Sequence, residues 1–115
     1  MHELSVCQSM LDQVSAIAAQ HRARSVSRIT LRIGPISGIE PRLLSDAFSI
    51  ARAGTIADDA ELTIETQAVR VHCETCGEET EAAINRLLCG ACGDYHTRLI
   101  SGDELLLASV ELEND

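Results

Sequence analysis

The amino-acid sequence predicts an α+β (mixed α/β) fold in which a small sheet and two helices are interrupted by an inserted four-cysteine module. Segments with a helical period alternate with segments of a strand period. Two copies of a Cys-x-x-Cys-Gly motif lie close together in the second half of the chain. At 115 residues the chain has room for one small domain with an outgrowth. We expect residues 1–70 and 100–115 to form the α/β body and residues 71–99 to form the inserted module.

The beginning of the chain predicts a helix followed by a strand. Between Glu3 and about His21, apolar residues recur three and four positions apart, as on one face of an amphipathic helix. These residues include Leu4, Cys7, Leu11, Val14 and Ala18. From residue 26 to residue 33 apolar and polar residues alternate, which is typical of a strand buried on one face. Gly34-Pro35 then ends this strand.

A second helix and two further strands complete the predicted body. Glu40-Pro41 puts proline at a first helical position, and Gly54 closes the apolar pattern that follows. Residues 61–71 alternate and run directly into the first cysteine motif, so we expect one strand to lead to it. Residues 104–113 are rich in Leu and Val and suit a strand that rejoins the main sheet.

The paired motifs predict a zinc site. Each Cys-x-x-Cys closes a tight turn, and the glycine after it can adopt the positive φ that this turn favours. The four thiolates come at a spacing that fits one tetrahedral Zn²⁺ ion, and the candidate ligands are Cys73, Cys76, Cys89 and Cys92. Cys7 is left over, and its place on the apolar face of the first helix indicates a small core residue.

Charge and composition exclude some classes of binding partner. The chain has no lysine and a formal net charge of −9, and four zinc-bound thiolates would add further negative charge. A surface of this sign repels phosphate, and only Phe48 and Tyr95 could stack on bases, so we expect no nucleic-acid partner. There is no long apolar run and no export signal at the N-terminus, from which we expect a cytoplasmic protein without a membrane partner.

The first three residues, Met1-His2-Glu3, suggest a second metal site. A histidine at position two places the free α-amine, its own peptide nitrogen and its imidazole within one chelate. Nitrogen donors in a plane suit Ni²⁺ or Cu²⁺ better than Zn²⁺. A histidine at this position is otherwise an ordinary solvated terminal residue.

Several of these features together resemble the HypA/HybF family, the nickel metallochaperones of [NiFe]-hydrogenase maturation. They are Met1-His2-Glu3-Leu4-Ser5 opening the helix, Arg32-Ile33-Gly34 at the strand end, and the paired motifs before a final acidic strand. The resemblance covers essentially the whole chain. It implies that the α/β body binds nickel at its N-terminus, through His2 and the backbone nitrogens of Met1 and Glu3. It also implies that the four cysteines hold a separate structural zinc.

The resemblance further implies the maturation GTPase HypB and the hydrogenase large-subunit precursor as partners, with urease served by some members. A homodimer is left open. Some relatives have a histidine directly after a Cys-x-x-Cys motif, where this chain has Gly77 and Gly93. His72 and His96 lie nearby but outside that pattern, so no ligand-switching role is assigned to them.

Two other function classes are weighed against the nickel carrier. A zinc-ribbon adaptor that only binds proteins would not need His2. An enzyme would need an open metal position or an activated nucleophile, whereas a four-thiolate site is closed and no nucleophile–base pair or phosphate loop is apparent. The sequence therefore favours a nickel carrier that is not an enzyme.

Overall fold

The computed structural model describes residues 2–114, which fall into two compact units. Within this range, the first unit contains the residues up to Leu31, Ile39–Glu65 and the residues from Leu106 on. We call it the helix unit. The second, the cysteine unit, contains Arg32–Gly38 and Thr66–Leu105. Among the described residues, no helix is long and apolar enough to cross a lipid bilayer.

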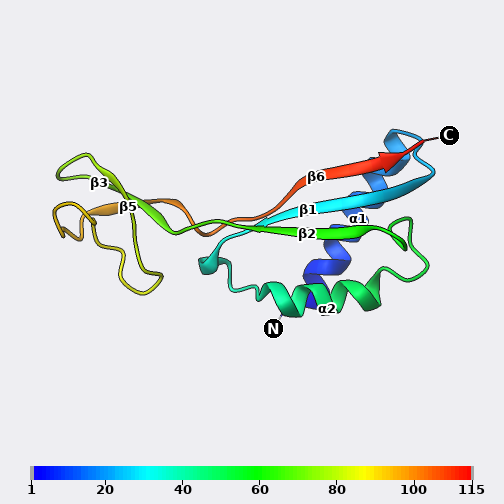
Figure 1. Ribbon diagram of the computed structural model, residues 1–115, viewed down its shortest axis with the longest axis horizontal. Coiled ribbons are helices and arrows are strands. Elements are labelled where there is room, and N and C mark those ends of the chain that lie inside the picture. The colour runs from blue at the N-terminus through cyan, green and yellow to red at the C-terminus, as the bar shows by residue number, and fades with distance from the viewer. Residues whose placement is uncertain (1, 115) are drawn as a thin grey trace. The chain divides into compact units, whose positions relative to one another are not determined.

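The helix unit packs two helices against a three-stranded sheet. The helices are α1 (Glu3–Gln20) and α2 (Pro41–Ala51), and the sheet has the order β2 (Glu61–Thr66), β1 (Ser25–Ile33), β6 (Leu105–Glu113). Both helices lie on the same side of the sheet, with β1 in its centre (Figure 1). The prediction that the last strand rejoins the main sheet is confirmed.

The buried face of α1 differs from the predicted one at its first turn. Its buried residues are Glu3, Cys7, Met10, Leu11, Val14 and Ala18. Leu4 is 51% exposed, so its assignment to the buried face is wrong. Successive helical residues are rotated by about 100° around the helix axis. At this rotation Glu3, and not Leu4, lies on the same face of the helix as Cys7 and Val14. A charged side chain therefore occupies a position where the sequence pattern favours an apolar one.

Helix α2 begins as its sequence predicts and ends slightly earlier. Glu40 is the capping residue, its carboxylate accepts the N–H of Arg42 at 3.5 Å, and Pro41 follows at the first helical position. The helix ends at Ala51, and Gly54, with φ +76°, lies in the turns that follow. Gly54 thus shapes the connection to β2 and does not cap the helix directly.

The cysteine unit contains a second sheet with the order β4 (Glu79–Glu81), β3 (Arg70–Cys73), β5 (Thr97–Ser101). Strand β3 pairs antiparallel with both neighbours. The single strand predicted over residues 61–71 is therefore wrong, because the segment forms β2 and β3 in two different sheets. Alternation continues in both strands, and sequence period alone does not mark the change of partner.

Two glycines approach each other closely in the cysteine unit. The N–H of Ile36 donates to the carbonyl of Gly102 at 2.7 Å, at the start of a short 3-10 helix, η1 (Pro35–Ser37). A Cβ on Gly34 would lie 2.1 Å from the carbonyl carbon and oxygen of Gly102. The strand end predicted at Gly34-Pro35 is confirmed, and the close approach gives the physical reason for glycine there.

Candidate metal centre

The two Cys-x-x-Cys-Gly motifs fold into two turns with the same backbone hydrogen bond. The N–H of Gly77 donates to the carbonyl of Cys73 at 3.0 Å, and the N–H of Gly93 donates to the carbonyl of Cys89 at 2.9 Å. Both glycines have positive φ, +80° and +79°. This left-handed conformation is accessible to glycine at little cost, which explains why each motif ends in this residue.

The turns bring the four cysteine sulfurs together. All four Sγ atoms lie within 4.8 Å of one another, and the nearest pairs, Cys73 with Cys92 and Cys76 with Cys89, are 3.6 Å apart. Four thiolates at these distances can surround one tetrahedral ion and leave no open coordination position. The arrangement is a four-cysteine metal site with a closed set of ligands.

The four cysteine residues differ in their exposure to solvent. The first cysteine of each motif, Cys73 or Cys89, is buried, whereas the second, Cys76 or Cys92, is exposed. The buried cysteines accept backbone hydrogen bonds at their sulfurs, from the N–H of Cys76 at 3.3 Å and from that of Cys92 at 3.4 Å. We call the buried cysteines, Cys73 and Cys89, inner and the exposed ones, Cys76 and Cys92, outer. Each turn therefore stabilises the thiolate of its inner cysteine with the backbone amide of its outer cysteine.

These hydrogen bonds contribute to unequal pKa values among the four thiols. The N–H of Cys92 lowers the pKa of Cys89 to about 6, and the N–H of Cys76 lowers the pKa of Cys73. At Cys76 the N–H of Glu78 opposes the shift, but partial loss of hydration and the neighbouring thiols raise the pKa to about 12. The inner sulfurs thus lose their protons more readily, and a divalent cation would displace the protons from the outer ones.

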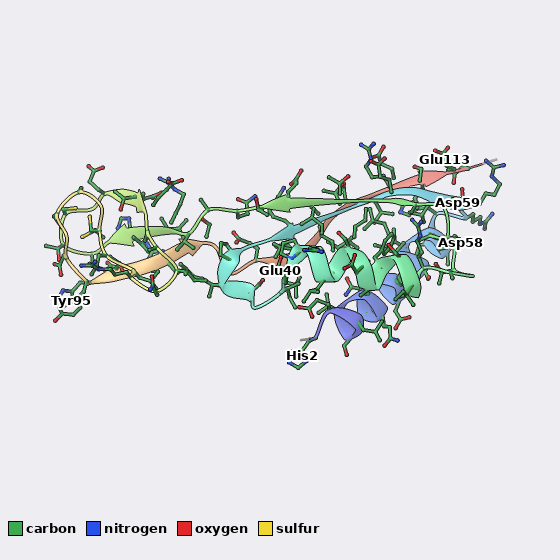
Figure 2. All side chains as sticks on the ribbon, turned by 60° about the horizontal axis from the view of Figure 1, so that its bottom comes forward. His2, Glu40, Asp58, Asp59, Tyr95 and Glu113 are labelled. Carbon is green, nitrogen blue, oxygen red and sulfur yellow. The ribbon has the colours of Figure 1, made fainter. Side chains whose placement is uncertain are left out.

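A chain of side-chain hydrogen bonds connects the two motifs outside the sulfur cluster. The hydroxyl of Thr75 donates to one carboxylate oxygen of Asp94. The other oxygen lies 2.8 Å from Nδ1 of His96 and accepts the N–H of His96 at 3.2 Å. The bonds from Thr75 and from His96 hold the pKa of Asp94 well below its usual range. Figure 2 labels Tyr95, which is 72% exposed and whose ring lies 4.1 Å from that of His96.

A further side-chain hydrogen bond ties the second motif to β4. The N–H of Gly90, inside the second motif, donates to Oγ1 of Thr80 on β4 at 2.8 Å. Neither connection is predicted by the sequence pattern described above. The turn from Asp94 to the N–H of His96 could have been foreseen, because Asp commonly accepts the amide two residues later. The pairing of Thr75 with Asp94 depends on the tertiary fold and has no local signal.

Neither nearby histidine joins the metal-ligand cluster. Among the described residues, the one group of His, Cys, Asp and Glu side chains placed to hold an ion is the set of four cysteines. Nδ1 of His72 lies 3.9 Å from the carboxylate of Glu79, and His96 pairs with Asp94. Both imidazoles therefore face carboxylates of the cysteine unit.

The N-terminal candidate residues lie at the start of α1. Met1 falls outside the described residues. His2 is exposed and precedes the first helical residue, and its carbonyl accepts the N–H of Val6 at 2.9 Å. Its side chain extends from the beginning of the helix (Figure 2). The side chain of Glu3 is directed differently: it is buried, and its carboxylate accepts the N–H of Glu40 at 3.3 Å.

Comparison with known proteins decides the family. Residues 1–112 match the family model described as "HypA: Hydrogenase/urease nickel incorporation, metallochaperone, hypA". The chain belongs to the HypA family. Members of this family are metallochaperones and maturation factors, not enzymes, and the four-cysteine site of this HypA-family chain fits that description.

Relatives and solved structures agree along the full length. The chain is 46% identical over 112 residues to the hydrogenase maturation factor HypA of Nitrosospira multiformis, with 97% of each chain covered. It is 41% identical to the HypA of Aquifex aeolicus over the whole of both chains. The solution structure of the Ni metallochaperone HypA from Helicobacter pylori superimposes with a TM-score of 0.71 at 26% identity and covers all of both chains.

Proposed function

We propose that this HypA-family chain carries Ni²⁺ at its N-terminus and delivers it for the maturation of [NiFe]-hydrogenase. The ligands would be the α-amine of Met1, the peptide nitrogen and imidazole of His2, and the backbone nitrogen of Glu3. The cysteine unit would hold a structural Zn²⁺ on Cys73, Cys76, Cys89 and Cys92. In this division residues 1–70 and 100–115 form the nickel-binding domain and residues 71–99 form the zinc-binding domain.

The observation that carries the nickel proposal is the state of His2. The first N–H groups of a helix have no partner within the helix, so the peptide nitrogens of the N-terminal turn are not needed for its hydrogen bonds. The imidazole of His2 is exposed and makes no capping bond, while the carbonyl of His2 is fixed by Val6. A planar nitrogen chelate can therefore form without unwinding α1, and its donor set suits Ni²⁺.

The carboxylate of Glu3 is left out of this ligand set. It is largely buried and accepts the N–H of Glu40 at 3.3 Å. The four proposed nitrogen donors would fill a square plane, and a site at an exposed terminus leaves the position above that plane accessible to a ligand from a partner. Such a position permits ligand exchange, which a carrier needs and a closed four-thiolate cage does not offer.

The zinc proposal rests on the chemistry of the donor set. Four thiolates in tetrahedral reach suit Zn²⁺, and free thiols persist in a reducing compartment, which supports a cytoplasmic location. The partners proposed for delivery are the maturation GTPase HypB and the large-subunit precursor of the hydrogenase. The family description supports participation in hydrogenase maturation, with urease as a further target class.

The deciding experiment is a calorimetric nickel titration of the zinc-loaded protein. We expect His2→Ala, and a variant with additional residues before Met1, to lose high-affinity nickel binding. His21→Ala is the matched control, because His21 is an exposed histidine at the opposite end of the same helix and should leave binding unchanged. Undiminished affinity in both N-terminal variants would refute the carrier and favour the zinc-ribbon adaptor.

A further inference from the structure

The unequal exposure of the four cysteine residues gives the metal centre an inner and an outer side. Cys73 and Cys89 are buried, whereas solvent reaches Cys76 and Cys92. A bound ion exchanges ligands first where a competing ligand can approach its sulfurs. Loss of metal is therefore expected to begin at Cys76 and Cys92, and whatever limits the separation of their two loops limits metal release.

Three residues connect these two outer loops. Thr75 directly precedes Cys76, and its hydroxyl donates to the carboxylate of Asp94. Asp94 lies two residues after Cys92 and is itself fixed by the N–H and Nδ1 of His96, at 3.2 and 2.8 Å. We call Thr75, Asp94 and His96 the latch. It spans the two motifs, and none of its atoms belongs to the group of metal ligands.

We propose that Asp94 is a positioning residue of the metal centre, which through Thr75 holds the loops of Cys76 and Cys92 together and slows metal release. This inference rests on the zinc occupancy proposed above. The latch bonds do not involve the ion, so they restrain the outer sulfurs before binding and during any partial loss of ligands. Restraint of this kind lowers the entropic cost of binding and favours re-attachment of a sulfur that has left the metal.

Two substitutions separate the hydrogen bond from the charge. Thr75→Val removes the donor and keeps the carboxylate of Asp94, whereas Asp94→Ala removes the carboxylate and all its bonds. Ser101→Ala is the matched control, since the Ser101 hydroxyl donates to the carbonyl of Ala68 at 2.8 Å within the same unit but away from the motifs. The measurement is the rate at which zinc-loaded, full-length protein transfers Zn²⁺ to an excess of a chromogenic chelator.

We expect release to be about three- to tenfold faster in Thr75→Val, the loss that one solvent-exposed hydrogen bond of ordinary strength would produce. Asp94→Ala should release zinc at least as fast, and the double variant should be no faster than Asp94→Ala, because both changes break the same connection. Ser101→Ala should match the wild type. In cobalt-substituted protein, the absorption bands of a four-thiolate site should be the same in wild type and Thr75→Val.

Release of zinc at the wild-type rate in both Thr75→Val and Asp94→Ala would overturn the latch proposal. An equal acceleration of release in Ser101→Ala would overturn it as well. A changed cobalt spectrum in Thr75→Val would also overturn it, since the substitution would then alter the ligand set. If Asp94→Ala fails to fold, Thr75→Val decides alone. Failure of the wild type to bind zinc would instead refute the proposed zinc occupancy, and the latch with it.

Discussion

The carboxylate of Glu3 accepts a hydrogen bond from the backbone N–H of Glu40, 3.3 Å away and 37 positions later in the sequence. The bond connects the first turn of α1 to the residue that caps α2. It gives a partner to an amide at a helix start and explains why a carboxylate occupies the buried line of α1. It also fixes the residue next to His2.

Replacing Glu3 tests this connection. We expect Glu3→Ala to lower the melting temperature by several degrees in a calorimetric scan, because the N–H of Glu40 loses a buried acceptor. Glu3→Gln keeps an acceptor oxygen and should fall between this variant and the wild type. Asp12→Ala, at an exposed position of the same helix, is the control and should melt like the wild type. Equal melting of Glu3→Ala and the wild type would contradict the account.

The nickel affinity of the same variant is a second measurement. If Glu3 acts by fixing the chain next to His2, Glu3→Ala should bind nickel more weakly at temperatures where it remains folded, since a less ordered chelate loses more entropy on binding. The carboxylate is not among the proposed ligands, so the loss should be smaller than that of His2→Ala. A loss as large as that of His2→Ala would indicate that the carboxylate itself binds nickel.

Cys7 is predicted to be a structural residue. It is fully buried in α1, and its thiol donates to the carbonyl of Leu44 on α2 at 3.5 Å. Burial raises the pKa of this thiol, so it is a poor thiolate. Cys7→Ala should cost about 1–2 kcal/mol in urea unfolding, as expected for a small cavity, with both metals still bound. Loss of either metal in Cys7→Ala would show that the thiol has a role beyond packing.

The four-cysteine site should be independent of nickel binding. Cys73→Ser removes an inner ligand and should reduce zinc content from about one ion per chain toward zero, with loss of order in the cysteine unit. Most of the nickel affinity should remain, because the proposed nickel ligands lie at the start of α1. Metal analysis together with the nickel titration checks this prediction. Parallel loss of both metals would argue for a single shared site.

Gly34 should tolerate no side chain. A Cβ at this position would lie 2.1 Å from two backbone atoms of Gly102, so Gly34→Ala requires the backbone to move and should cost about 3 kcal/mol or more in urea unfolding. Gly38→Ala is the comparison, because Gly38 has φ +80° but open space around it. It should show only the cost of backbone strain, about 1 kcal/mol. Similar costs for the two variants would contradict the steric explanation.

The sequence predicted most of the local structure. Helix α2 begins at Glu40-Pro41 as the capping pattern requires, and both cysteine motifs form the turns that their glycines favour. Prediction failed where two elements meet. Leu4 is apolar but exposed, whereas Glu3 is charged, buried and bonded to the N–H of Glu40, a partner 37 positions away. The identity of the nickel ligands, Met1 included, stays a prediction, which the calorimetric nickel titration tests.

By itself the sequence determined the helices, most of the strands and the set of four cysteines, because period, capping and turn geometry depend on residues close together in the chain. Only the tertiary structure decided that residues 61–71 divide between two sheets, that Glu3 is buried, and that Thr75 meets Asp94 across 19 positions. These outcomes depend on contacts between distant segments. Local propensity carries no information on such contacts, because their partners are chosen by the path of the whole chain.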